Sequence, residues 1–426
     1  MRHLLTKKNI SWAFYDWANS AYTTIVVTTF FPVLFGSYWY AGTGSENTTT
    51  PLGIANAVAS LTVVLLAPIL GAIADRGDLK KRFLILFLLL GVLFVSTLSF
   101  IDEGDWQLAI SVYVLSFIGF AGANVFYDAM LVDITETDKF DIISALGFSL
   151  GYLGGGLALL GCVVFANPQS FGFEHVTPVN HIVLIFLFTG IWWALFSLPL
   201  LFNVKTSKAT ATLPLGMAIK EGVSQLVHTF SEIRKLKVVF TFLLAYWLYI
   251  DGVDTIIKMA VDYGMSLGFD SGDLIMALLI TQFVGFPAAI GFGILAKYIG
   301  TKAGILSGIL IYIIVTVIAS RIQSTSEFYL LAVMIGLVQG GVQALSRSFY
   351  ARIIPLHQSA EFFGFYNMLG KFAAVIGPVM MGIVSVMTGE PRLSILSISV
   401  LFILGGILLY FVDEQKAKSM LIDYVK

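Results

Sequence analysis

The sequence has few charged residues. Asp, Glu, Lys and Arg make up 12% of its 426 residues, whereas hydrophobic residues make up 58% and the mean hydropathy is +0.88. Water-soluble domains carry about twice that share of charge, so the composition excludes a water-soluble enzyme and indicates a protein that works in a lipid bilayer. Lys and Arg number 25 against 26 Asp and Glu, a net charge of −1. Because proteins that bind nucleic acid carry basic faces, we expect no nucleic-acid partner.

Residues that bind metals or form disulfides are also scarce. The chain has one cysteine, Cys162, and five scattered histidines, so it can form no internal disulfide and has no metal-ligand spacing. Residues 364–371 superficially resemble a phosphate-binding loop, but they have one residue too many between the glycines, and Phe372 stands where Ser or Thr would bind magnesium. We therefore expect no metal, no cofactor and no nucleotide hydrolysis. Accumulation of a solute would have to draw on a proton gradient or another ion gradient.

Long hydrophobic runs dominate what is present. A helix needs about 20 apolar residues to cross the hydrocarbon core of a bilayer. The predicted spans are residues 12–40, 52–74, 83–101, 106–132, 142–166, 181–202, 238–263, 274–296, 303–320, 328–354, 362–388 and 393–412. The sequence therefore predicts an all-α membrane protein with twelve transmembrane helices. Because the first run is much longer than the core of a signal peptide, we expect it to remain as a signal anchor.

The segments between these spans carry their positive charge on one side. If the N-terminus is cytoplasmic, the cytoplasmic segments hold nineteen Lys or Arg, and the opposite loops hold only Arg321 and Arg392. Positive residues are enriched on the cytoplasmic side of membrane proteins. Both termini are therefore predicted to be cytoplasmic.

The longest internal loop divides the spans six and six. It predicts an N-terminal six-helix bundle over residues 1–202, a cytoplasmic linker over 203–237 and a C-terminal six-helix bundle over 238–426. Hydrophobic residues at helical spacing between 219 and 233 indicate an amphipathic helix on the membrane surface. An ordinary linker helix explains that pattern equally well.

The two halves are weakly similar to each other. Residues 71–76 after the second span have a counterpart in residues 293–298 after the eighth, and Lys81 and Lys302 follow at similar distances. Duplicated halves are typical of secondary transporters, whose binding site lies where the repeats meet. We therefore expect two pseudo-symmetric bundles.

Polar and ionisable residues are concentrated in a few of the spans. An ionisable group in the middle of a membrane helix costs at least about 2.5 kcal/mol, so it indicates a functional or paired position. The first, fourth, seventh and tenth spans hold most of these groups and occupy equivalent positions in a three-span repeat. The eleventh span adds one isolated lysine. The predicted substrate and proton cavity is lined by Asp16, Asn19, Asn124, Asp128, Asp251, Asp254, Lys258, Gln339, Gln343, Arg347 and Lys371.

The position of each residue along its span predicts its depth in the membrane. Asp16, Asp128 and Arg347 fall in the cytoplasmic third, whereas Asp254 falls nearer the midplane, where a carried solute would bind. Structural roles are an open alternative for each of these residues. Asp254 and Lys258, one turn apart, would neutralise each other, and Arg347 would be a strut to Asp16 or Asp128.

Glycines mark one face of the fifth span. Gly147, Gly151 and Gly155 repeat every four residues, with Gly154 and Gly156 beside them. Small residues at this spacing let helix backbones approach closely. The stripe predicts close helix packing, and a sliding surface for rocking halves is compatible with it.

The segment between the second and third spans contains a recognisable motif. Residues 71–82 read Gly-Ala-Ile-Ala-Asp-Arg-Gly-Asp-Leu-Lys-Lys-Arg and resemble the loop at this position in the major facilitator superfamily, with a small departure in the last basic residues. Such an acid and the cations after it can pair with acids on a neighbouring helix, here Asp133 or Glu136, and latch the halves in one state. A plain cluster of cytoplasmic positive charge would give the same sequence. The predicted conformational gate comprises Gly71, Asp75, Arg76, Lys81, Arg82 and Asp133.

More specific strings narrow the resemblance. The segments that resemble the vacuole-effluxer-like branch of the superfamily are residues 15–21, 124–129, 146–156, 251–256, 340–348 and 361–366. Fungal members of this branch are tied to autophagy and to amino-acid release from the vacuole. The resemblance covers essentially the whole chain. It implies the major facilitator fold, in which the first, fourth, seventh and tenth spans surround a cavity that opens alternately to each side of the membrane.

The polar face and the resemblance together predict a secondary active transporter. We expect it to carry a small polar solute, an amino acid or a related metabolite, with proton coupling. Acids such as Asp251 and Asp254 would meet an ammonium group or carry protons, and Arg347 or Lys371 would meet a carboxylate. We expect a monomer whose partners are its small-molecule solute and the lipid bilayer, and the short loops favour a bacterial inner (plasma) membrane.

Other classes of function fit the sequence less well. A non-transporting membrane receptor or assembly factor on the same fold is the main alternative, but polar faces in both halves argue against it. A passive channel would need rings of acidic or carbonyl groups, which the sequence does not show. An enzyme would need a nucleophile and a base arranged together, and the sequence shows no such arrangement.

Overall fold

The computed structural model describes residues 6–41, 48–171, 177–205, 216–217, 220–221, 224 and 236–425. Within these residues, twelve helices are long and apolar enough to cross a membrane, which confirms the predicted all-α fold. The predicted amphipathic helix between residues 219 and 233 falls largely outside the described residues.

The N-terminal half contains six spans joined by short helical turns. Its elements are α1 (Lys7–Ala21), η1 (Tyr22–Phe30), α2 (Phe31–Leu34), η2 (Phe35–Trp39), α3 (Thr49–Gly77), α4 (Lys80–Thr97), η3 (Leu98–Phe100), α5 (Trp106–Ala129), α6 (Leu131–Ile134), η4 (Thr137–Lys139), α7 (Phe140–Ala166), η5 (Pro168–Phe171), α8 (Val179–Ile182) and α9 (Leu184–Asn203).

The C-terminal half repeats this arrangement and ends in a short additional helix. Its elements are α11 (Lys237–Ser266), α12 (Ser271–Ile299), α13 (Thr301–Ala319), α14 (Thr325–Ile353), η6 (Leu356–Gln358), α15 (Ser359–Thr388), α16 (Pro391–Ser397), α17 (Ser399–Tyr410) and α18 (Glu414–Val425).

Several helices extend past the hydrophobic runs that predicted them. The first span begins at Lys7 instead of residue 12, and α12 continues to Ile299 instead of residue 296. Only the part of a helix in the hydrocarbon core must be apolar. Hydropathy therefore underestimates the length of helices whose polar ends reach the headgroup region.

The first span is not a uniform α-helix, because the segment η1 is π-helical. The hydroxyls of Thr28 and Thr29 both donate to the backbone carbonyl of Thr24, at 2.8 and 2.7 Å. Such side-chain bonds compete with the regular helical ladder. A π-helical segment is uncommon and often lies at a functional site, and this one lines the cavity described below.

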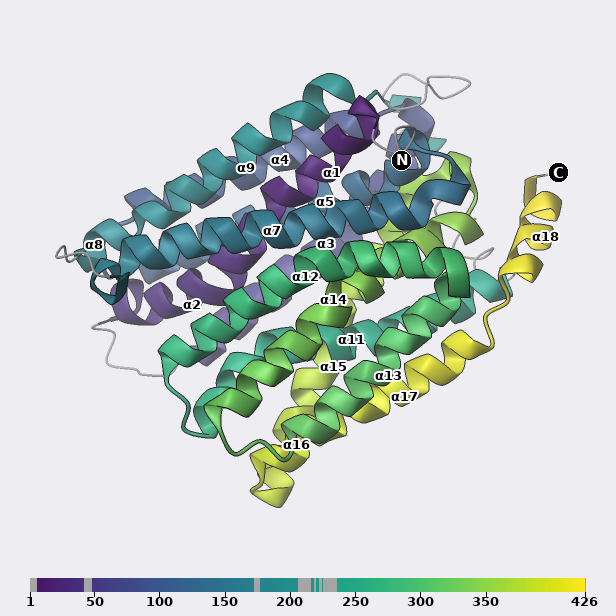
Figure 1. Cartoon of the computed structure of the whole chain (residues 1–426). Helices are drawn as coiled ribbons and strands as arrows, with labels where there is room; N and C mark the ends of the chain where they lie inside the picture. The colour runs from purple at the N-terminus through teal and green to yellow at the C-terminus, as the bar shows by residue number, and fades with distance from the viewer. Residues whose placement is uncertain are drawn as a thin grey trace.

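The two halves lie side by side and contact each other along part of their length (Figure 1). The contacts between them are made chiefly by α7 with α12 and α14, and by α3 with α15. The start of α1 and the end of α18 lie at the same end of the molecule. We call this the basic end, because the lysines that open α1 and α4 lie there.

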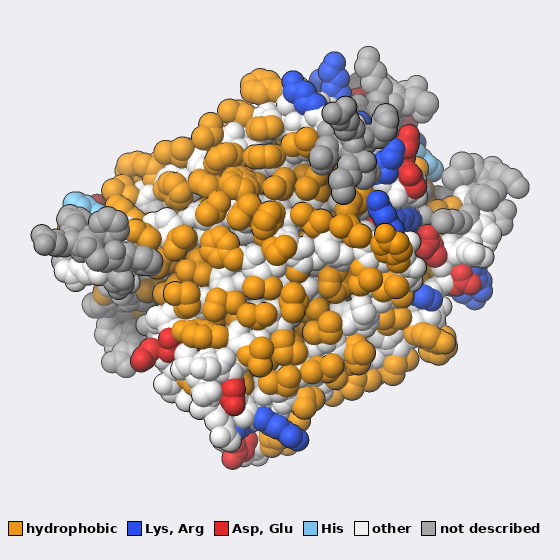
Figure 2. Space-filling model, in the orientation of Figure 1, with side chains coloured by type: hydrophobic (Ala, Val, Ile, Leu, Met, Phe, Trp, Pro, Cys, Tyr) orange, Lys and Arg blue, Asp and Glu red, His pale blue; other side chains and the backbone are white. Residues whose placement is uncertain are grey.

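The surface is that of a membrane protein. Hydrophobic side chains form a broad band across the visible face, and charged side chains gather at the two ends of the helices (Figure 2). Exposed hydrophobic residues include Leu89, Leu93 and Leu310. Apolar side chains in this position are favourable only against lipid.

The predicted similarity between the halves appears as a matched pair of hydrogen bonds. At the start of α4, Lys81 donates to the carbonyl of Val204, which follows α9, at 2.7 Å. At the start of α13, Lys302 donates to the carbonyl of Val412, which follows α17, at 2.9 Å. In each half, therefore, a lysine of the third span donates to a backbone carbonyl just after the sixth span. Such contacts are favourable because cations stabilise helix C-termini.

The glycine stripe of α7 lets α1 approach closely. A Cβ atom on Gly151 would lie 2.6 Å from the hydroxyl of Ser20, and one on Gly154 would lie 2.7 Å from the indole of Trp17. Gly156 faces the other half instead, next to Gln282 of α12. Most of the stripe therefore serves packing inside the N-terminal half.

Candidate functional site

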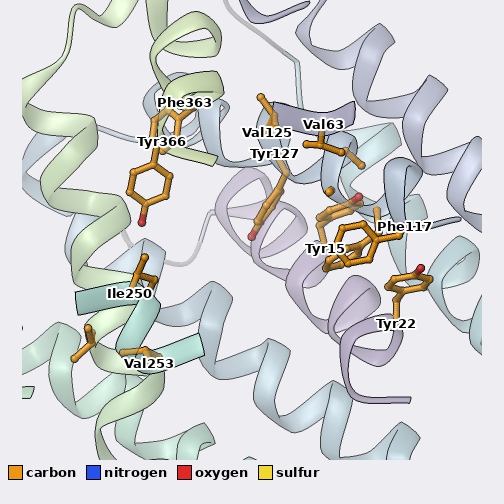
Figure 3. Packing of buried hydrophobic residues seen from close by; sticks show 14 of the residues in the cluster. Tyr15, Tyr22, Val63, Phe117, Val125, Tyr127, Ile250, Val253, Phe363 and Tyr366 are labelled. Carbon is orange, nitrogen blue, oxygen red and sulfur yellow. The ribbon is translucent and has the colours of Figure 1, made fainter. Parts of the chain in front are cut away.

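A polar cavity lies between the two halves. With its mouth it comprises about 1900 Å³, and its walls come from α1, η1, α3, α5 and α7 on one side and from α11, α12, α14 and α15 on the other. Ten of the eleven residues predicted for the cavity line it, namely Asp16, Asn19, Asn124, Asp128, Asp254, Lys258, Gln339, Gln343, Arg347 and Lys371. Figure 3 shows Tyr127 of α5 and Tyr366 of α15, two further lining residues, approaching from the two halves.

Arg347 closes the cavity towards the basic end. Its side chain is 2% exposed, and its guanidinium pairs with Asp128 at 3.0 Å and with Asp16 at 3.3 Å. It also donates from Nε to the hydroxyl of Ser144 at 2.9 Å and from Nη2 to the carbonyl of that residue at 3.1 Å. Arg347 belongs to α14, whereas its partners belong to α1, α5 and α7. Of the two roles considered for Arg347, the structure therefore shows the strut, and the strut joins the two halves.

Both acids that hold Arg347 have a second partner. The hydroxyl of Tyr127 donates to Asp16 at 2.8 Å, and the amide of Asn367 on α15 donates to Asp128 at 3.1 Å. Hydrogen bonds to a carboxylate stabilise its charged form. Sequence reasoning missed Tyr127 and Asn367, because a tyrosine or an asparagine in a membrane helix is less unusual than a charge.

Aromatic rings surround the same guanidinium. Its central carbon lies 4.4 Å from the ring centre of Phe148, 4.7 Å from that of Trp12 and 5.3 Å from that of Tyr127. Aromatic faces attract a cation that has been removed from water. The positive charge is therefore buried between rings and carboxylates at the cavity wall.

Three other charged residues line the cavity without an ion pair. These are Asp254 and Lys258 on α11 and Lys371 on α15. In the part of the chain that the structure describes, none of them has an opposite charge within 4.0 Å. Asp254 and Lys258 thus form no ion pair with each other, although their spacing allows one. The ammonium of Lys371 lies 5.3 Å from the ring centre of Phe117 on α5 and so reaches across to the other half.

Amide side chains occupy the space between the charged groups. Asn19 donates to the side-chain oxygen of Asn124 at 2.8 Å, which joins α1 to α5 within one half. Tyr152 on α7 donates to Gln343 on α14 at 3.2 Å and joins the two halves. These groups offer neutral donors and acceptors that can orient a polar solute.

Asp251 was predicted to line the cavity, and this prediction is wrong. Its side chain is buried with 0% exposure and is directed towards α15, where it accepts from the backbone N–H of Gly377 at 3.0 Å. It also accepts from the hydroxyl of Thr255 at 3.3 Å. Asp251 and Asp254 lie at similar depth in the membrane but on adjacent faces of the span. Depth along the span alone therefore does not show which of them faces the cavity.

A second cluster joins the halves nearer the basic end, around Asp141 at the start of α7. This acid is 7% exposed and accepts from Arg352 at 2.6 Å, from Ser348 at 2.5 Å and from Thr301 at 2.9 Å. All three donors belong to the C-terminal half. Sequence reasoning missed Asp141 because it lies at the edge of the fifth span. The sequence did contain a signal for it. Asp141 lies one turn before Ser144, on the helix face that continues to Gly151.

The predicted gate at the α3–α4 turn exists in part. Asp75 accepts from the backbone N–H groups of Ala360 and Glu361, at 3.1 and 2.8 Å, at the start of α15. An acid at a helix N-terminus is favourable. A Cβ atom on Gly71 would lie 2.3 Å from the carbonyl oxygen of Ala360, so this contact requires glycine.

The cation of this gate is Lys80, not Lys81 or Arg82 as predicted. Lys80 is 8% exposed, pairs with Asp133 at 3.2 Å and with Asp75 at 3.4 Å, and donates to Ser359 at 2.7 Å. The tight turn through Asp78, whose φ is 54°, directs the first residue of α4 inwards. The predicted members that lie elsewhere are Lys81, which donates to the end of α9, and Arg76 and Arg82, which are exposed.

The clusters around Arg347, Asp141 and Asp75 all lie on the basic-end side of the cavity. The cavity's walls on the other side include Thr28 and Ser60 in one half and Ala260 in the other. Among the described residues, no hydrogen bond or ion pair joins the halves beyond these positions. In the described part of the chain, the hydrogen bonds and ion pairs between the halves therefore lie at the basic end and around the middle of the cavity, and they hold the basic end closed.

Comparison with known proteins identifies the family. A sequence model described as "Vacuole effluxer Atg22 like" matches residues 42–421. The chain belongs to this family. It is 38% identical over 424 residues to the uncharacterized MFS-type transporter YxiO of Bacillus subtilis strain 168, covering 99% of this chain and 98% of that protein. It is also 25% identical to the autophagy-related protein 22 of Vanderwaltozyma polyspora, over 80% of this chain and 73% of that protein.

Solved structures confirm the fold. The crystal structure of the major facilitator superfamily transporter FucP in the outward conformation superposes with a TM-score of 0.72 at 13% identity, covering 96% of this chain and 99% of that one. The chain is thus a major facilitator superfamily transporter, an integral membrane protein with a small-molecule substrate. Its relatives are transporters and not enzymes, in agreement with the sequence prediction.

The cluster around Asp141 predicts how the basic end is held shut. Asp141→Asn removes the charge that Arg352 binds, so we expect faster hydrogen–deuterium exchange in residues 137–148 and 344–353. Asp138→Asn is the matched control, since Asp138 carries the same charge three residues earlier but is exposed. Equal exchange in the two variants would contradict a holding role for Asp141.

Gly147 provides a second test, because it lies under the Arg347 cluster. A Cβ atom there would lie 2.5 Å from Oδ2 of Asp16 and 3.0 Å from Nη2 of Arg347. Overpacking of this kind costs about 1–3 kcal/mol, so Gly147→Ala should lower the thermal unfolding midpoint in detergent. Gly161→Ala on the same helix meets no atom within 4 Å and should leave the midpoint unchanged or raise it, because alanine favours the helix. A midpoint for Gly147→Ala at or above that of the control would refute the close contact.

Proposed function

We propose that this transporter carries a small zwitterionic solute, an amino acid or a related metabolite, by alternating access and with proton coupling. The observation that carries the proposal is the set of charged cavity residues without ion pairs, Asp254, Lys258 and Lys371. Such charges are expensive inside a membrane protein unless a ligand pairs with them. A solute that bears both an ammonium and a carboxylate supplies both kinds of partner at once.

The proposed contacts follow from charge. Asp254 binds the ammonium group, and Lys371, helped by Lys258, binds the carboxylate. Asp254 interacts electrostatically with both lysines, so the three residues form one local field. Arg347 is not a binding group in this conformation, since Asp16 and Asp128 already occupy its donors.

Arg347 and its acids form the proposed gate and the site of proton coupling. The bridge joins the halves, so it has to break before the basic end can open. A proton that binds Asp128 or Asp16 removes one of the negative charges that hold Arg347 and weakens the bridge. When the basic end opens, water reaches the carboxylate and the proton leaves. A ligand changes the balance between two conformations only through a difference in affinity, and protonation supplies that difference here.

The distribution of charge supports an orientation. We propose that the basic end faces the cytoplasm, so both termini are cytoplasmic and the conformation described above opens to the outside. The bacterial relative supports a plasma-membrane location. The cavity lies between the halves of one chain and needs no residue from a second copy, so we propose that the monomer is the working unit.

The solute class can be tested by binding. Wild-type protein should be stabilised in a thermal-shift assay by amino acids, but not by the corresponding primary amines or carboxylic acids at equal concentration. A charge-assisted contact contributes about 1.5–3 kcal/mol, so Asp254→Asn and Lys371→Gln should each weaken amino-acid binding roughly 10- to 150-fold. Lys302→Gln, which removes a lysine outside the cavity, is the control. Unchanged binding in both cavity variants would refute the assignment.

Transport by the proposed mechanism can be measured in proteoliposomes. An imposed pH gradient should drive accumulation of a labelled amino acid above its equilibrium level. Asp254→Asn and Arg347→Ala should abolish this uptake while the protein still reaches the membrane, because one removes a solute contact and the other removes the gate. Uptake that only equilibrates regardless of the gradient would refute proton coupling, and normal uptake in both variants would refute the cavity assignment.

A further inference from the structure

Asp251 is a buried acid that the proposed carrier cycle does not use. It lies halfway along α11, is 0% exposed and is not among the residues that line the cavity. Its Oδ1 accepts two hydrogen bonds, from the N–H of Gly377 and the hydroxyl of Thr255. Its Oδ2 is buried and has no hydrogen-bond partner among the described residues.

The surroundings of Asp251 disfavour a negative charge. Among the described residues, no Lys, Arg or His lies within 4.0 Å of it. The charged groups that act on it are Asp254 and Lys258, one and two turns further along α11. An isolated carboxylate in such a place becomes neutral by taking up a proton, because burying the charge costs far more than burying the acid. With Oδ1 already accepting two hydrogen bonds, Oδ2 is the atom that carries the proton.

The acid is attached to a weak point of α15. Pro378 has no N–H, so the helical ladder of α15 lacks one bond there, and the preceding N–H, on Gly377, bonds to Asp251. A Cβ atom on Gly377 would lie 1.9 Å from the hydroxyl of Thr255, so only glycine allows this contact. The arrangement ties the middle of α11 to the point where α15 can bend most easily.

The rest of α15 connects this point to the gate and the cavity. Towards the basic end, the same helix carries Lys371, which lines the cavity, and Asn367, which binds Asp128. Its first residues donate their backbone N–H groups to the carboxylate of Asp75. One helix, α15, therefore connects the gate, the cavity and Asp251.

We propose that Asp251 is a proton-binding site separate from the solute cavity, protonated while the basic end is closed and deprotonated when α15 moves. The transport part of this proposal rests on the proposed function. The proton passes between Oδ2 and water reached in the open state, and no other group is oxidised, reduced or transferred. Asp251 thereby couples protonation to the shape of α15 without touching the solute.

The charge state can be tested without any solute. The infrared spectrum of the purified wild-type protein at mildly acidic pH should contain the carbonyl-stretch band of a protonated carboxylic acid, and a component of this band should be lost in Asp251→Asn. The band should remain in Thr255→Val, which keeps the acid and removes one hydrogen bond. Asn resembles the neutral acid in shape and hydrogen bonding, so the variant should elute as a single species of wild-type size. Identical spectra for wild type and Asp251→Asn would overturn the proposal.

The coupling role has a separate readout in proteoliposomes with a ¹⁴C-labelled amino-acid mixture. Asp251→Asn should retain exchange of internal for external label, whereas accumulation driven by a pH gradient should fall below the wild-type level, because one of the two proposed proton sites is lost. Gradient-driven accumulation equal to wild type would overturn the coupling role, and loss of both exchange and accumulation would assign Asp251 a structural role instead. If the wild-type protein moves no label, the proposed function falls, and the infrared comparison still decides whether Asp251 holds a proton.

Discussion

The bridge between Arg347 and the two acids of the opposite half is the interaction on which the rest of the structure depends. It places one cation of α14 among Asp16, Asp128 and Ser144, and so fixes the distance between the halves at one level of the membrane. Gly147 leaves room for it, and aromatic rings pack against its guanidinium. Removing one partner from a buried ion pair costs about 3–5 kcal/mol, which is enough to hold one conformation and small enough for a ligand or a proton to reverse.

The charges of the cavity divide into two groups with different tasks. Those near the basic end pair with each other across the halves and hold the protein shut. Those nearer the middle, on α11 and α15, form no ion pair with any described residue and are the proposed contacts of the solute. This division explains how a chain with so few charged residues can both bind a polar solute and respond to it, since α15 takes part in both groups through Asn367 and Lys371.

The sequence was sufficient for the fold and for most of the cavity, because lipid makes both easy to recognise. Apolar runs of sufficient length identify the spans, and the cost of a buried charge makes residues such as Asp254 conspicuous. It was insufficient where the outcome depends on rotation about a helix axis or on the geometry of a turn. Asp251 points away from the cavity for the first reason, and Lys80 replaces Lys81 in the gate for the second. Asp141 was overlooked because it lies at the edge of a predicted span. A charged residue in the adjoining loop costs little free energy, so it does not stand out in the sequence.

The central claim is that the Arg347 bridge holds the halves together at the basic end. Its most direct test is the distance between spin labels, measured by pulsed electron resonance in a Cys162→Ser background. One pair, at Asp138 and Lys297, spans the halves at the basic end, and the other pair, at Ser37 and Met265, spans them at the opposite end; all four positions are exposed. In Arg347→Gln the first distance should lengthen and the second should shorten relative to wild type. If both distributions stay as in wild type, another contact holds the basic end closed and the account is wrong.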